Sequence, residues 1–125
     1  MTDTTLREIA YKLADGQKVQ AVVHQGDNEL FRAMAAFAGR SGWTNAYSVV
    51  FDPGKNVTEH DHPEDVVLYY PDGANGTPII VEGEAIYPEP GEMLFVPKHA
   101  RHEVPFNATD KRRISIALKV TDEEA

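Results

Sequence analysis

The chain of 125 residues contains no cysteine and has a formal net charge of −8. The length predicts one domain, residues 1–125, and the lack of cysteine excludes disulfides, thiolate nucleophiles and cysteine-ligated metal centres. The acidic balance argues against nucleic acid and against an anionic membrane as partners. There is no run of about eighteen apolar residues that would span a bilayer. Because the first residues also lack a signal-peptide pattern, we expect a cytoplasmic protein.

The first part of the chain, residues 1–43, reads as a mixed extension. Thr4 or Thr5 can cap a short helix over residues 6–14, and residues 18–25 alternate as a strand. The apolar residues within 28–39 fit a period of 3.6 as well as a period of two. Helix and strand therefore both stay open for that segment.

From residue 43 onward the pattern predicts strands, separated by turns that recur about every 8–12 residues. The predicted strands are residues 43–51, 57–62, 65–70, 77–83, 84–91, 92–97, 101–106 and 112–120. The fourth and fifth form a hairpin about the turn at Glu82 and Gly83. The basic run of residues 111–113 is interpreted as flanking the start of the last strand. This spacing is typical of an all-β antiparallel sandwich or barrel, here preceded by a short helical or mixed segment.

Two histidines, His60 and His62, are separated by one residue on the predicted strand 57–62. Side chains two apart on a strand share a face, with Cα atoms about 6.5 Å apart, so both rings can bind one metal ion. His102 lies on a later strand, and spacing alone does not establish that it meets the other two. We interpret His24 and His99 as surface or hairpin histidines and keep His99 as a candidate pocket contact.

These segments resemble the paired motifs of the cupin superfamily. The matching residues are Gly54, His60, His62 and Gly73 in the first motif and Gly91, Pro97 and His102 in the second. The resemblance covers residues 48–120 and implies a motif-bearing core of about 44–120. It implies an antiparallel β-barrel of the double-stranded β-helix, or jelly-roll, type. It further implies that the three histidines bind one divalent transition metal.

The match to the cupin motifs is incomplete at three positions. Val66 occupies the position of the family's metal-binding glutamate, His99 that of a glycine, and the motif asparagine falls one residue late, at Asn107. We expect the first departure to affect chemistry and the other two to affect loop geometry. Glu64 or Asp65 could replace the glutamate as a ligand; otherwise they are solvated loop acids or hydrogen-bond acceptors near the site.

Three neutral imidazoles leave the full charge on a divalent ion, which favours anionic chelating substrates. Iron(II) is the first choice, with zinc, manganese or nickel as alternatives. Resemblance to three-histidine cupins implies a dioxygenase acting on a small diketone or enolate, carboxylate or thiol. The alternatives are a non-oxidative isomerase, lyase or cyclase and a ligand-binding cupin without turnover. The resemblance also implies a homodimer, in which residues 2–37 are candidates for covering a sheet edge.

Strand alternation predicts a mostly apolar substrate pocket next to the histidines. Its expected lining residues are Thr58, Val66, Leu68, Tyr70, Val104, Phe106 and Ile116. The candidates for a catalytic role are Glu64, Asp65, Tyr70 and His99.

Overall fold

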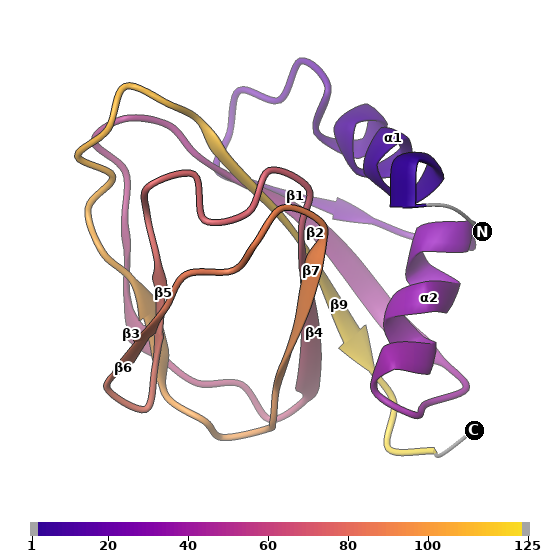
Figure 1. The fold of residues 1–125 in the computed structure, drawn as a ribbon. Helices are drawn as coiled ribbons and strands as arrows, with labels where there is room; N and C mark the ends of the chain where they lie inside the picture. Colours follow the sequence, from indigo (N-terminus) through magenta and orange to yellow (C-terminus); the bar gives the residue numbers. More distant parts are fainter. Residues whose placement is uncertain (1–2, 124–125) are drawn as a thin grey trace.

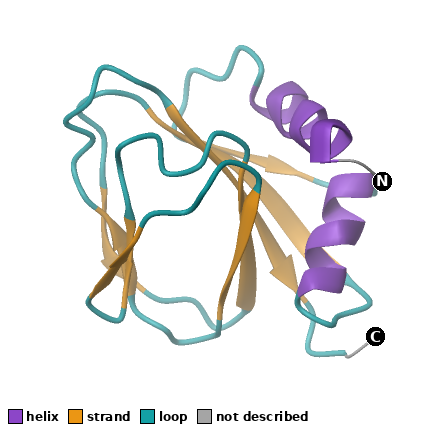
Figure 2. Ribbon diagram, viewed as in Figure 1, coloured by secondary structure: helices purple, strands orange, loops and turns teal. Residues whose placement is uncertain are grey.

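The structure, a computed structural model, describes residues 3–123 as two antiparallel sheets and two helices (Figures 1 and 2). The helices are α1 (Asp3–Ala14) and α2 (Glu29–Phe37). The strands are β1 (Ala21–His24), β2 (Trp43–Phe51), β3 (Val57–His60), β4 (Asp65–Tyr70), β5 (Ile79–Val81), β6 (Glu84–Ile86), β7 (Glu92–Val96), β8 (His102–Val104) and β9 (Arg113–Val120). Residues 1–2 and 124–125 lie outside the described part of the chain. The predicted start of the domain and of its N-terminal segment, at residue 1, and the predicted end of the domain, at residue 125, fall there.

One sheet has five strands in the order β1-β2-β9-β4-β7, and the other has four in the order β3-β8-β5-β6. All described pairings are antiparallel. The predicted hairpin is confirmed, because β5 and β6 are joined by Glu82 and Gly83, both with positive φ, as a tight two-residue turn requires. The all-β prediction with an N-terminal helical or mixed segment is therefore confirmed.

The ambiguous segment 28–39 is a helix. The side chain of Asn28 accepts a hydrogen bond from the backbone N–H of Phe31 at 2.8 Å, which caps the first turn of α2. Leu30, Phe31, Met34 and Ala35 are buried, a spacing that gathers on one face of a helix. Helix α1 begins at Asp3, so its first turn already contains the two threonines expected to cap it, and that expectation is wrong.

The hydrophobic core lies between the helices and the outer face of the five-stranded sheet (Figure 1). It contains Ala10, Leu30, Phe31, Met34, Ala35, Ala46, Val67, Tyr69, Ile116, Leu118 and Val120. The prediction that Ile116 lines the pocket is therefore wrong. Alternation groups the apolar residues of β9 on one face, but the helices give this sheet a second buried face, and Ile116 faces them. Neither helix within residues 3–123 is long and apolar enough to cross a membrane.

Candidate metal centre

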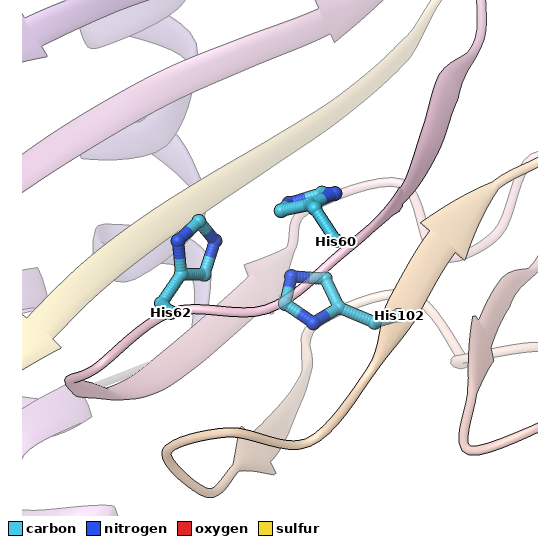
Figure 3. Close-up of side chains that lie close together, drawn as sticks. All are labelled: His60, His62 and His102. Atoms are coloured by element: carbon cyan, nitrogen blue, oxygen red, sulfur yellow. The ribbon is translucent and has the colours of Figure 1, made fainter.

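The three motif histidines converge on one point between the two sheets (Figure 3). Each ring offers one nitrogen, and these three atoms lie within 4.8 Å of one another. The ring centroids of His60 and His102 are 4.3 Å apart, and His62 lies 4.8 Å from His60 and 5.0 Å from His102. The structure thus brings His102 to the other two, which the sequence spacing had left open.

Two pairings between distant segments hold the histidines in place. In the pairing of β3 with β8, His60 lies opposite His102. The strand ends at His60, two residues before its predicted end, so His62 belongs to the following loop. The carbonyl of His62 accepts a hydrogen bond of 2.8 Å from the backbone N–H of His99. The turn that precedes β8 therefore positions the loop that carries His62.

Hydrogen bonds to the backbone orient two of the rings. The Nδ1 atom of His60 lies 2.8 Å from the carbonyl oxygen of Thr58, and the Nδ1 atom of His102 lies 2.9 Å from that of Ala100. Because a carbonyl oxygen can only accept, each Nδ1 carries the proton and each Nε2 keeps its lone pair. Metal-binding histidines commonly have this arrangement, with the second ring nitrogen held by a backbone acceptor.

The electrostatics of the cluster favour neutral imidazoles. Burial lowers the pKa of His62, and the neighbouring His102 and His60 lower it further. Burial also lowers the pKa of His102, against the opposing effect of its hydrogen bond to Ala100. A metal ion binds only the neutral form of histidine, so these shifts reduce competition from protons. Three converging nitrogens with free lone pairs suit zinc, iron, nickel or copper better than magnesium or calcium.

The histidines form part of the wall of a cavity of about 680 Å³ between the two sheets. Its lining includes five of the predicted pocket residues: Thr58, Val66, Leu68, Tyr70 and Val104. Phe106 does not line it, and that prediction is wrong, because β8 ends at Val104 and the alternation does not continue. The side chain of Phe106 is 63% exposed. Whether a substrate occupies this cavity stays a prediction.

Comparison with solved structures identifies the architecture. A cupin 2 conserved barrel domain protein from Salinispora arenicola superimposes with a TM-score of 0.57 and 18% identity, covering 82% of this chain and 75% of that chain. The chain has the cupin fold. A scan of protein-family models and a search of curated proteins found no match.

The fold is also similar to those of two larger proteins. A variant of salicylate 1,2-dioxygenase from Pseudoaminobacter salicylatoxidans gives a TM-score of 0.59 at 20% identity, covering 95% of this chain and 34% of that one. The DMSP lyase DddQ from Ruegeria pomeroyi gives a TM-score of 0.54 at 23% identity, covering 68% of this chain and 42% of that one. The chain thus spans less than half the length of either protein, and at these identities the likeness concerns the fold alone.

The cupin motif departures have separate structural consequences. Val66 lines the cavity, so no carboxylate stands at the family's glutamate position. His99 has a φ of 67°, a conformation that glycine adopts most readily. Asn107 is buried and its side-chain N–H groups donate to the carbonyls of Phe51 and Lys111, each at 2.8 Å. As expected, the last two departures concern loop geometry.

The two acids after the histidines do not join the metal cluster. Asp65 is buried, accepts a hydrogen bond of 2.7 Å from the Lys98 backbone and pairs with Arg40 at 2.8 Å. Burial alone would raise its pKa, but these two partners hold the pKa of Asp65 below its ordinary value. Glu64 lies 3.7 Å from the ammonium group of Lys119. The structure thus gives Asp65 a structural role and places Glu64 against a lysine, so the idea that either replaces the missing ligand finds no support.

The remaining catalytic candidates differ in their position. Tyr70 lines the cavity and is 1% exposed, and burial raises its pKa, so its hydroxyl keeps its proton. The His99 side chain is 67% exposed, lies 3.8 Å from Asp61 and is not part of the cavity wall. Tyr70 therefore remains a candidate for a role in the site, whereas His99 contributes through its backbone.

Sequence reasoning missed two basic residues of the cavity wall, Arg113 and Lys119. Arg113 begins β9, in agreement with its predicted place at the start of the last strand, but the near-complete burial of its side chain was not predicted. Both side chains lie on the same face of β9 as those of Ser115 and Ala117, which also line the cavity. The alternation of β9 groups these residues on its more polar face, and the structure shows that this face, and not the apolar one, lines the cavity.

Proposed function

We propose that this cupin is a mononuclear metal-dependent enzyme, an iron(II) dioxygenase that acts on a small anionic chelating organic substrate. One observation carries the proposal: three imidazoles converge on the wall of a cavity of about 680 Å³. A cavity of this size accommodates a small organic molecule.

The histidines and the backbone carbonyls beside them have separate roles in the proposed metal site. His60, His62 and His102 would hold the ion, and the carbonyls of Thr58 and Ala100 fix the rings of the first and third. When bound, iron(II) supplies Lewis acidity and the redox chemistry with dioxygen that amino-acid side chains lack. Three ligands leave coordination positions open, and the absent carboxylate leaves the site more positive than the usual cupin arrangement.

The cavity wall supports binding of an apolar body with an anionic end. The apolar surface for such a body is supplied by Val66, Leu68, Ile79, Val96 and Val104. The ammonium group of Lys119 lies 5.3 Å from the ring centroid of Tyr47, and both side chains line the same cavity. A cation on this wall favours the ionised form of a bound substrate.

A dioxygenase fits the cavity better than a non-oxidative enzyme. Isomerases and lyases that remove a proton need a positioned base. None of the cavity-lining side chains within residues 3–123 is an aspartate or a glutamate, and the raised pKa of Tyr70 disfavours a tyrosinate. The fold similarity to a salicylate 1,2-dioxygenase agrees with this choice but carries no chemistry by itself.

A metal-dependent lyase is the second candidate, because the fold is also shared with a DMSP lyase. In that case the Glu64 carboxylate, which lies 3.7 Å from the ammonium group of the cavity-wall residue Lys119, is the candidate proton acceptor. Whether turnover needs dioxygen separates the two candidates.

The test is dioxygen uptake by protein loaded separately with iron(II), zinc, manganese or nickel. The substrates are a panel of β-diketones, aromatic acids and small thiols, and His102→Ala serves as the control that lacks one ligand. We expect uptake with iron(II) alone and none with the variant. Consumption of a substrate without dioxygen would favour the lyase, and recovery of every compound unchanged would contradict both enzyme proposals.

A further inference from the structure

Arg113 is a buried cation in the cavity wall. Its side chain is 1% exposed, and its Nε–H donates to the carbonyl of Thr77 at 2.9 Å. The guanidinium carbon lies 4.9 Å from the ring centroid of Tyr70 and 5.3 Å from that of Phe51. Two aromatic rings and one backbone acceptor thus hold the guanidinium group in a fixed orientation.

This arginine has an unused hydrogen-bond donor and no acidic partner. Its Nη2 atom is buried and has no hydrogen-bond acceptor, and none of the ion pairs among residues 3–123 includes Arg113. Buried charges in proteins are usually paired, and buried donors are usually satisfied. The missing acceptor therefore points to a group that enters the cavity from outside.

The charge of the cavity agrees with an anionic guest. Its lining contains Arg113 and Lys119 but, within the described part of the chain, no aspartate or glutamate. The chain as a whole has a net charge of −8, so the cavity has the opposite sign to the molecule. A cavity lined by one sign of charge attracts ligands of the other sign.

Arg113 and the histidines lie toward opposite ends of this cavity. Along β9, Lys119 follows Arg113 by six positions, a distance of about 20 Å between Cα atoms. Lys119 pairs with Val66 on the strand that follows His62, whereas Arg113 pairs with Phe51. Side chains extend into the space between, and Leu68 and Ala117 line its middle.

We propose that Arg113 binds a carboxylate group of the substrate, at the end of the cavity remote from the histidines. The free Nη2 atom offers N–H donors to one carboxylate oxygen. Tyr70 lines the same cavity, with its ring centroid 4.9 Å from the guanidinium carbon, so its hydroxyl proton is a donor for the second oxygen. We infer that the substrate is a small organic acid with a carboxylate at one end and a metal-chelating group at the other. The chelating group rests on the proposed function.

The experiment uses metal-free protein in chelator at pH 8, where the imidazoles are neutral. Isothermal titration calorimetry compares benzoate with benzamide and hexanoate with hexanamide, pairs that differ in charge but hardly in shape. We expect each acid to bind wild-type protein at least tenfold more tightly than its amide. Equal affinity for acid and amide would overturn the proposal.

Substitutions at two arginines localise the effect. Arg113→Met should reduce the acid-to-amide ratio to about one, whereas Arg101→Met, which removes a surface arginine paired with Glu59, should leave it unchanged. An unchanged ratio in folded Arg113→Met would overturn the proposal. If that variant does not fold, the nitrogen NMR signals of the wild-type Arg113 side chain decide, since they should shift with benzoate and not with benzamide, and no shift with either refutes the assignment.

The metal-free condition separates this inference from the proposed function. Selective binding of acids by a protein that takes up no metal would support Arg113 as the anion site and refute the metal-dependent enzyme. A metal-loaded protein whose metal-free form shows no preference for acids would leave the enzyme proposal intact and refute the role of Arg113.

Discussion

Replacing Val66 with glutamate tests whether position 66 faces the histidines and whether a carboxylate is what the site lacks. Val66 is 6% exposed, lines the cavity and lies opposite Lys119 in the pairing of β4 with β9. A carboxylate introduced here is desolvated, at a cost that the nearby ammonium group offsets only in part. We expect a net loss of about 2 kcal/mol in the unfolding free energy of the metal-free protein. For a chain of this length that corresponds to a melting temperature lower by roughly 6–10 °C.

In the metal-bound form, by contrast, the glutamate of Val66→Glu should be stabilising. A fourth, anionic ligand should tighten zinc binding at least tenfold, or about 1.4 kcal/mol, and saturating zinc should recover the lost stability. Calorimetric zinc titration and thermal melts with and without zinc measure the two effects. Val66→Gln is the matched control, because it has the same shape without the charge. Zinc binding by Val66→Glu no tighter than by Val66→Gln would refute this placement of position 66.

Two further predictions follow from the same geometry. His99 has a φ of 67°, so His99→Gly should relieve backbone strain of about 1 kcal/mol and raise the melting temperature by roughly 3–5 °C, whereas a lower melting temperature would contradict the strain. The pKa values of His62 and His102 are lowered from 6.5 in the folded metal-free protein, so the unfolded chain binds more protons as the pH falls through 6.5. Urea denaturation should therefore show a free energy of unfolding that decreases as the pH is lowered from 8 to 5. The double variant His62→Gln, His102→Gln should show a smaller decrease. An equally large decrease in the variant would count against these pKa shifts.

The sequence predicted the strands and the candidate ligands because both depend on local patterns. Period-two alternation and regular turns identified the β-rich region, and two short motifs identified His60, His62 and His102. What remained uncertain was the segment 28–39, where alanine-rich spacing fits two periods. The cap at Asn28 and the apolar face of the sheet beneath α2 decided in favour of helix.

The content of the cavity could not be predicted because alternation does not reveal which face of a strand is inside. Ile116 belongs to the apolar face of β9, and that face packs on the helices. The opposite face, with Arg113 at one end and Lys119 at the other, lines the cavity. The position of Arg113 in the cavity wall therefore follows only from the packing of the helices on the opposite face of β9.

The most direct test of the central claim is the metal content of the wild-type protein and of His102→Ala, with His99→Asn as a control that keeps a residue tolerant of positive φ. Equilibrium dialysis against zinc or iron(II), followed by elemental analysis, should give about one ion per chain for the wild type and the control. His102→Ala should retain less than about a tenth of that. Its metal-free melting temperature should stay within a few degrees of the wild type, because we propose a functional and not a structural metal. Equal metal content in all three proteins, or none in any, would contradict a centre built from His60, His62 and His102.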